Sequence, residues 1–316
     1  MPGRFPEDAF EPVAITSRSG YDESVHFGAA VVVDAGGSVV WSIGDPTVEV
    51  YPRSACKPMQ ADAMVRCGLT LTAEQLALAC ASHDGTPRHV EVVRSTLASA
   101  GLDELALGNT PDLPLDPGAA EAILRTGGHR TPITMNCSGK HAAMVATCVA
   151  NGWPIDTYLS QDHPLQVAIT ERIAELTGGV THVGVDGCGA PAHVVALDGL
   201  ARAFGELART RGAVWSAMTS HPELVGGERR DATRLMRTVP ELMAKGGAEG
   251  IYAAALPDGL AAALKISDGA HRASGIVLAA ALREAGVDVD PSQLGEPIRG
   301  HGQPVGTCRS LIGSGR

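Results

Sequence analysis

VHFGAAVVVDAGGSVVWSIGD, residues 25–45, predicts a β-hairpin. Two runs rich in β-branched residues flank the turn Ala35-Gly36-Gly37. A second hairpin is predicted late in the chain, in GIYAAALPDGLAAALKISDG, residues 250–269, where Pro257-Asp258-Gly259 supplies the turn. Strands near both ends and helices between them favour one antiparallel sheet built from an N-terminal and a C-terminal hairpin.

The middle of the chain is predicted to be helical. Thr72 and Gln75 have the spacing of a capping box and open a helix toward Cys80. Residues 138–154 predict a helix that ends at Asn151-Gly152. Further helices are indicated by Thr86-Pro87, by the expected caps Asp162 and Asp198, and by the periodicity of 274–286.

The fold class that follows is α+β, with flanking helices and a helical middle region around an antiparallel sheet. Strands and helices do not alternate, and no GxGxxG motif follows a strand, so a doubly wound parallel sheet is not expected. We expect a single domain over 1–316, with residues 1–14 loosely held.

The composition excludes several classes of partner. A net charge of −10 argues against nucleic acid or an acidic membrane surface as a partner. No run reaches the ~18 apolar residues of a membrane span, and MPGRFPEDAFEP, residues 1–12, does not resemble a signal peptide. Seven cysteines are an odd number and lie far apart, which predicts free thiols in a reducing cytoplasm.

Lysine is rare in this chain, and its positions are informative. Of 25 basic residues only four are lysines: Lys57, Lys140, Lys245 and Lys265. Ser54 and Lys57 stand three apart at a predicted helix start, so they share a face. A neutral lysine amine can activate a serine, whereas arginine does not lose its proton. The alternative is a capping serine beside a solvated lysine.

Two more positions are candidates for the same chemistry. Ser82 lies in CASHDG, residues 80–85, where a polar helix end is the alternative to a pocket position. Lys265 lies on the last strand of the late hairpin, where serine hydrolases with an S-x-x-K motif place a second basic residue. Lys245, in AKGGAEG, is interpreted as an ordinary loop lysine.

Two cysteines are candidate metal ligands. Cys137 precedes a helix start, which favours a thiolate, and Cys188 lies in the glycine-rich VDGCGAP. Their spacing matches no standard zinc motif. Asp186 is either a carboxylate that supports the site or a turn former.

Five motifs in fixed order resemble the rhizobial-type (class 3) L-asparaginases, over about residues 16–308. They are SGYDESVHFGAAVVVD, VYPRSACKPMQ, CASHDG, MNCSGKHAAM and VDGCGAP. The resemblance implies a fold similar to serine β-lactamases and glutaminases. It also implies a cytoplasmic homodimer that acts on a small molecule.

The resemblance assigns roles residue by residue. Ser54 matches a nucleophile or proton-relay serine with Lys57 as its partner, and Ser82 a second serine paired with Lys265. A zinc site completed by water is implied at Cys137, Lys140 and Cys188. Asp186 matches a residue that supports this zinc site, and Arg53 and His141 match neighbours in the substrate pocket.

The expected activity is hydrolysis of L-asparagine to L-aspartate and ammonia, with Zn²⁺ positioning the substrate rather than activating water. Which serine forms the covalent bond and whether asparagine or glutamine is preferred stay open. The alternatives are a glutaminase, a serine amidase of the penicillin-recognising kind, and a metal-binding protein without catalysis.

Overall fold

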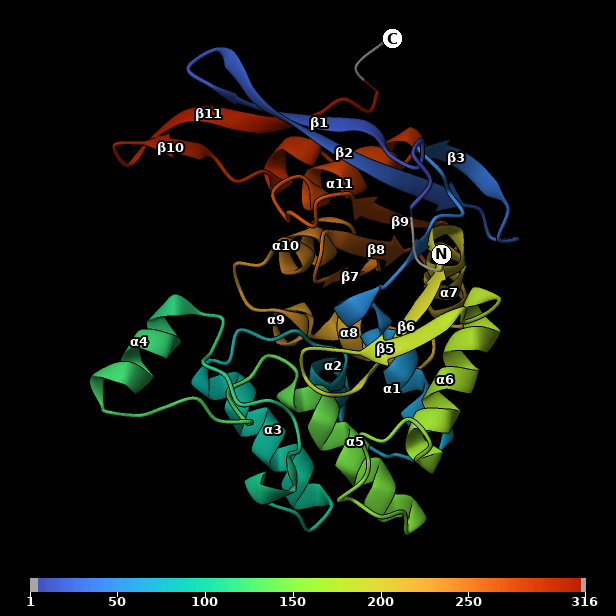
Figure 1. The fold of residues 1–316 in the computed structure, drawn as a ribbon, viewed down its shortest axis with the longest axis vertical. Helices are drawn as coiled ribbons and strands as arrows, with labels where there is room; N and C mark the ends of the chain where they lie inside the picture. The colour runs from blue at the N-terminus through green and yellow to red at the C-terminus, as the bar shows by residue number, and fades with distance from the viewer. Residues whose placement is uncertain (1–4, 314–316) are drawn as a thin grey trace.

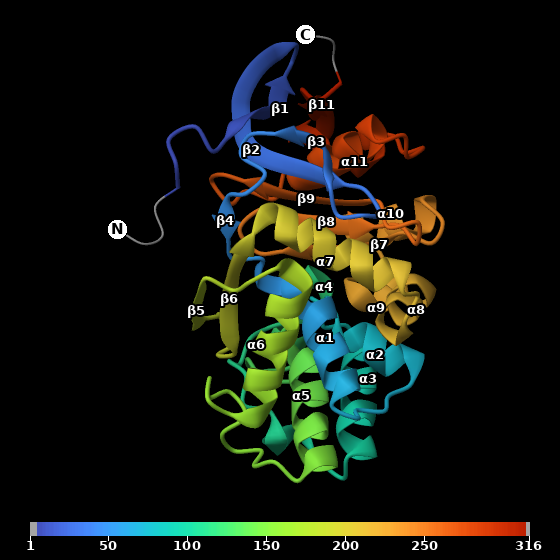
Figure 2. The ribbon, with the colours of Figure 1, turned by 90° about the vertical axis from the view of Figure 1, so that its right-hand side faces the viewer.

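An antiparallel sheet forms one half of the molecule and helices form most of the other half (Figures 1 and 2). The structure is a computed structural model that describes residues 5–313. Its main sheet has the order β10-β11-β1-β2-β9-β8-β7, with β3 paired to β2. The strands are β1 (Glu11–Arg18), β2 (Tyr21–Val33), β3 (Val39–Ile43), β7 (Met243–Gly247), β8 (Ile251–Ala255), β9 (Ala261–Ile266), β10 (Ile298–Gly300) and β11 (Gln303–Ser310).

Both predicted hairpins are confirmed and meet at the centre of the sheet. Strands β2 and β3 pair with Val31 opposite Ser42, and β8 and β9 pair with Ala253 opposite Ala263. The hairpins join where β2 pairs with β9. The sheet built from both ends of the sequence is therefore the observed one.

Alanine-rich strands let helices pack closely on both faces of this sheet. Every residue of β8 (IYAAA) and β9 (AAALKI) is buried, so side chains pointing in either direction are covered. Helices α7 and α11 both pack on these strands and on β2. The two helices therefore cover opposite faces of the sheet.

Most of the helices gather beside the sheet's β7 edge (Figure 2). The α-helices of the described residues are α1 (Lys57–Arg66), α2 (Ala73–Ala79), α3 (Pro87–Ser99), α4 (Pro117–Arg125), α5 (Ser138–Asn151), α6 (Pro164–Thr177), α7 (Leu197–Arg209), α8 (Ala213–Ser220), α9 (Pro222–Val225), α10 (Asp231–Thr238) and α11 (Ser274–Glu284). Short 3-10 turns are η1 (Arg53–Cys56), η2 (Glu104–Ala106) and η3 (Pro291–Leu294).

Most of the predicted helices are confirmed. The capping box of Thr72 and Gln75 forms with both of its hydrogen bonds, and α3, α5 and α11 lie where expected. The prediction that two helices begin with the caps Asp162 and Asp198 was wrong. Pro164 occupies the first turn of α6, so His163 is the N-cap and accepts from the Leu165 N–H. Strand β6 runs directly into α7, which leaves Asp198 inside its first turn.

A small second sheet and one close backbone contact bring the site residues together. Strands β4 (Glu49–Val50), β6 (Pro191–Ala196) and β5 (His182–Val185) form this sheet in that order. Edge strand β7 lies directly against η1, because a Cβ on Gly247 would stand 2.3 Å from the Pro52 carbonyl oxygen. The glycine therefore lets the sheet approach the start of α1.

The N-terminal segment expected to be loosely held falls partly outside the described residues, which exclude 1–4. Within the rest of it, Ala9 is fully buried and β1 begins at Glu11. None of the helices within residues 5–313 combines the length and the apolar character that a bilayer crossing needs.

Candidate active site

Ser54 lies in η1, the 3-10 turn that leads into α1, and an ion pair anchors the start of this turn. Arg53 has φ +51°, a backbone conformation that non-glycine residues rarely adopt. Its guanidinium binds one carboxylate oxygen of Asp186, at 2.8 Å and 3.2 Å. That ion pair ties the strained turn to the loop between β5 and β6. Ser54 is partly exposed, and its hydroxyl makes no hydrogen bond to any described residue.

Two lysine amines converge on the hydroxyl of Ser82. The Nζ atom of Lys57 lies 3.1 Å from Ser82 Oγ, and the Nζ atom of Lys245 lies 2.9 Å from it. Lys57 also donates to the Ala81 carbonyl, and Lys245 donates to that of Gly246 at 2.6 Å. Burial, together with the positive charge of Lys57, holds the pKa of Lys245 well below its usual value.

The predicted pairing of Lys265 with Ser82 was wrong. The amine of Lys265 donates to three backbone carbonyls, those of Glu249, Ile266 and Ser267, at the end of β9. In the sheet order, β9 is separated from edge strand β7 by β8. Lys245 on β7 occupies the place that the sequence analysis gave to Lys265.

Lys245 was missed because its local sequence has no strand signal. Strand β7 reads MAKGG, and two adjacent glycines normally weaken a strand. It forms because β8 pairs with it, with Lys245 opposite Ala253. One signal was available: lysine is scarce in this chain, and all four lysines are buried, none more than 7% exposed.

The predicted metal ligands come together at the N-terminus of α5. The Nζ atom of Lys140 lies 3.2 Å from Cys188 Sγ. A hydrogen bond from Cys188 keeps the pKa of the Cys137 thiol well below its usual value, helped by Lys57 and Lys140. The same bond, followed by burial, raises the pKa of Cys188. The two thiols therefore share one negative charge beside a lysine amine.

These three side chains fit a small thiophilic cation such as Zn²⁺. All three are buried, and two sulfurs with one nitrogen form a soft donor set. Within residues 5–313, no group of three His, Cys, Asp or Glu side chains could hold a metal. A zinc site at this place would therefore need the amine of Lys140 as a protein ligand.

His141 lies beside the thiols rather than in the pocket that contains Ser54. Its Nδ1 atom lies 2.7 Å from the Tyr158 hydroxyl, which itself accepts from the Gly108 N–H. Burial and the charge of Lys140 lower the pKa of His141 to about 4, so the ring is neutral. Its other nitrogen, Nε2, is buried, and the ring interacts with Cys188, which partly offsets the lowering of the His141 pKa.

Most of the remaining predicted residues line one small pocket beside Ser54. The pocket is bounded by Arg53, Ser54, Cys56, Lys57, Gln60, Lys140, Asp186, Pro191, Ala192 and His193. Burial raises the pKa of Cys56 to about 12, so this thiol is inert at neutral pH. The carboxyl of Asp186 is ionised, since Arg53 lowers its pKa despite the burial.

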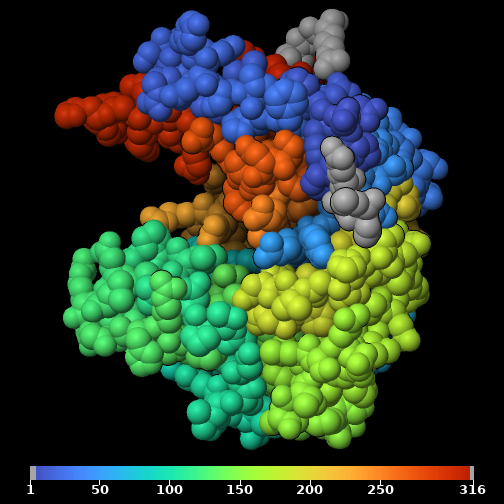
Figure 3. Space-filling view, in the orientation of Figure 1, coloured from blue at the N-terminus to red at the C-terminus, as the bar shows by residue number. Residues whose placement is uncertain are grey.

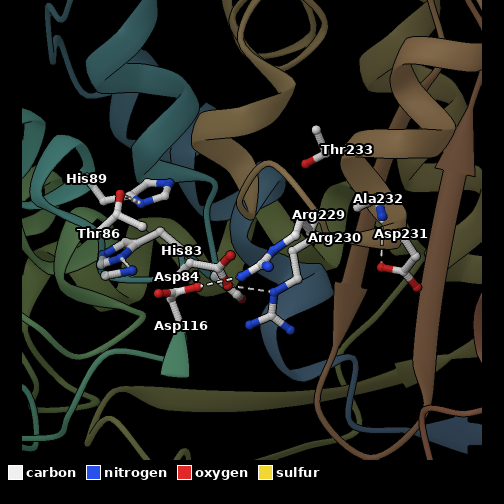
Figure 4. A network of polar contacts seen from close by, with 12 residues as sticks. His83, Asp84, Thr86, His89, Asp116, Arg229, Arg230, Asp231, Ala232 and Thr233 are labelled. Atoms are coloured by element: carbon white, nitrogen blue, oxygen red, sulfur yellow. Dashed lines mark hydrogen bonds and ion pairs between the residues drawn. The ribbon is translucent and has the colours of Figure 1, made fainter. Parts of the chain in front are cut away.

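The loop of Ser82 is held by the end of α9 and the segment that follows it. The Ser82 N–H donates to the Val225 carbonyl, and the Asp84 N–H donates to that of Gly226. Asp84 also forms an ion pair with Arg230 at 2.6 Å, and Asp116 forms one with Arg229 (Figure 4). Figure 3 shows this face hollowed between the green region around α4 and the red β10–β11 hairpin.

The order and spacing of these residues can be compared with known families. The family described as L-asparaginase II matches residues 14–310, which is most of the chain. The chain belongs to the L-asparaginase II family. As a member of that family it is an amidohydrolase, so the serine and lysine cluster belongs to an enzyme. None of the curated proteins matches the sequence.

Solved structures resemble this L-asparaginase II family member only distantly. A β-lactamase from Mycobacterium bovis shares 16% identity at a TM-score of 0.37, over 81% of this chain and 94% of its own. A putative β-lactamase from Bacteroides dorei shares 15% identity at a TM-score of 0.44, over 79% of this chain and 91% of its own. EstCE1, a hydrolase with promiscuous acyltransferase activity, shares 13% identity at a TM-score of 0.42, over 82% of this chain and 93% of its own. No functional conclusion rests on these similarities.

Proposed function

We propose that this amidohydrolase converts L-asparagine to L-aspartate and ammonia through a serine–lysine relay. The observation that carries the proposal is the Ser82 hydroxyl with a buried lysine amine on either side. Buried amines beside each other cannot both stay charged, so one is available as a base at neutral pH.

Ser54 is the better candidate for the attacking hydroxyl. It lines the pocket, its hydroxyl is free of hydrogen bonds to described residues, and it is partly exposed. The hydroxyl of Ser82 is engaged by both amines and does not line that pocket. Ser54 would form an ester with the side-chain carbonyl carbon of asparagine, which water then hydrolyses.

The remaining residues form a path for the proton. Lys57 passes a proton through the Ser82 hydroxyl to Lys245, whose low pKa makes it the neutral member. The freed amine of Lys57 takes the proton of Ser54 and returns it to the leaving ammonia. Every atom on this path lies within 3.1 Å of the next, except for the contact from Ser54 to Lys57, which must close when substrate binds.

The pocket also offers charges of both signs for an amino acid. Asp186 supplies a carboxylate that can bind the α-ammonium group, and the guanidinium of Arg53 supplies positive charge for the α-carboxylate. Zn²⁺, when bound by Cys137, Lys140 and Cys188, would hold end groups of the substrate in place. Its charge is nearly cancelled by two thiolates, so we assign it positioning rather than activation of water.

The decisive experiment measures ammonia release from L-asparagine and L-glutamine, and ring opening of nitrocefin by its colour change, with Ser54→Ala and Ser82→Ala alongside. We expect turnover of asparagine, and an acyl adduct on Ser54 by mass spectrometry after a rapid acid quench. An adduct on Ser82 would refute the assignment of the nucleophile. Turnover of glutamine or nitrocefin without asparagine would refute the substrate. We also propose a homodimer, which sedimentation would test.

A further inference from the structure

His193 has a polar atom that the described protein does not use. It lies on β6, it is 2% exposed, and it lines the pocket that contains Ser54, Lys140 and Asp186. Its Nδ1 atom is buried and has no hydrogen-bond partner. A buried nitrogen without a partner is unfavourable, because it has lost its hydrogen bond to water and gained none. Because His193 lines a pocket of charged groups, its unpaired nitrogen points to a ligand.

The other ring nitrogen indicates which tautomer is present. Nε2 of His193 lies 2.8 Å from the hydroxyl of Thr170 on α6. Helical threonines elsewhere in the chain, such as Thr147 and Thr177, donate their proton to the carbonyl four residues earlier. Thr170 makes no such bond, so its proton is available for Nε2. With Nε2 as acceptor, Nδ1 of a neutral ring carries the hydrogen and is a donor.

The surroundings keep this ring neutral and favour an anionic partner. Burial, followed by the positive charge of Lys140, lowers the pKa of His193 to about 4. The charged groups that share the pocket are Arg53, Lys57, Lys140 and Asp186. Three of these side chains are basic and one is acidic, so the pocket carries a net positive charge even with Arg53 and Asp186 paired at 2.8 Å. An N–H donor in a positive field suits a carboxylate oxygen.

We propose that His193 is a specificity residue whose Nδ1–H binds the α-carboxylate of the amino-acid substrate. This inference rests on the proposed function, because it names the part of asparagine that enters this end of the pocket. His193 takes no part in the proton path. It selects amides that carry a carboxylate over amides that do not.

The test compares L-asparagine with 3-aminopropanamide, which is asparagine without its α-carboxylate. His193→Asn keeps an N–H donor close to the Nδ1 position, whereas His193→Phe keeps only the ring shape. We expect His193→Phe to raise KM for asparagine about 10- to 100-fold with kcat little changed. Its kcat/KM for 3-aminopropanamide stays at the wild-type value, and His193→Asn recovers most of the preference for asparagine.

Two results would overturn the inference while the proposed function stands. One is a wild-type ratio of kcat/KM between the two amides in His193→Phe. The other is loss of bound zinc in His193→Phe, which would make the ring part of the metal site. L-aspartate binding, measured by calorimetry, separates the two proposals. Binding that weakens in His193→Phe, in an enzyme that does not turn over asparagine, would support the subsite and sink the asparaginase proposal. No L-aspartate binding at all would sink both.

Discussion

Replacing Lys245 with Met should remove most of the activity while leaving the fold intact. Lys245 is 3% exposed, and its amine lies 2.9 Å from Ser82 Oγ. Methionine fills a similar volume without a charge, so no large cavity opens. The proposed relay loses its proton acceptor, because Lys57 is then the only amine that contacts Ser82.

The expected size follows from the role. A general base in contact with its hydroxyl is worth about 10²- to 10⁴-fold in rate. That range corresponds to about 3–5 kcal/mol of transition-state stabilisation. The loss should fall on kcat and on kcat/KM equally, since Lys245 does not line the pocket that we propose for the substrate.

Lys265→Met is the matched control, because it removes an equally rare buried lysine from the same sheet. Its amine donates to three backbone carbonyls, and removal leaves these carbonyls short of a partner. We expect a loss of stability of about 1–3 kcal/mol and little change in kcat. Lys265 is the position that the sequence alone favoured, so the pair of variants also tests that choice.

The assay is steady-state ammonia release from L-asparagine, with thermal unfolding followed by circular dichroism on the same preparations. The reasoning is refuted if Lys245→Met keeps its kcat within threefold of the wild type. It is equally refuted if Lys265→Met, while folded, loses as much kcat as Lys245→Met. Far-UV spectra matching the wild type are required before either comparison counts.

Three further outcomes are expected. Gly247→Ala should cost about 1–3 kcal/mol of stability and lower kcat, because its Cβ would meet the Pro52 carbonyl. Gly246→Ala is the control, since the atom nearest to its Cβ would be 4.0 Å away, and it should change neither quantity. Thermal unfolding measures the stability, and ammonia release measures kcat. The pKa of Lys245 in the folded protein lies well below 10.5, so kcat/KM should rise with pH as this amine deprotonates and should become constant below pH 10.5. The measurement is the pH profile of kcat/KM. If the rise at acidic pH is the same in Lys245→Met as in the wild type, Lys245 is not the group that titrates. Removing zinc with a chelator should raise KM more than it lowers kcat, with metal content measured in parallel; complete loss of kcat at unchanged KM would exclude a positioning role.

Local signals in the sequence predicted the fold well. The turns Ala35-Gly36-Gly37 and Pro257-Asp258-Gly259 mark both hairpins, and the capping box at Thr72 marks α2. Hydrogen bonds inside a turn or a helix depend on residues only a few positions apart. For that reason the sequence contains them directly.

The sequence predicted which residues belong to the site better than it predicted which of them contact one another. Lys57 was expected to touch Ser54 three residues away, but its amine contacts Ser82 on another segment. Lys245 was read as a loop residue because β7 exists only through its pairing with β8. Contacts between strands and helices far apart in sequence depend on register and packing, which no local pattern encodes. His193 was likewise invisible as a pocket residue, since alternation along β6 gives its face but not what lies opposite.

The pairing of the first strand with the last has a consequence for how this enzyme is made. Ala14 of β1 lies opposite Ser310 of β11, so a ribosome must add roughly 300 residues, or about 15–60 s of synthesis, between the two partners. During that interval β1 is an unpaired edge strand of the nascent sheet, and a strand of a neighbouring polypeptide can pair with it. Slow translation of the last segment should therefore reduce the yield of active enzyme more than slow translation of the first.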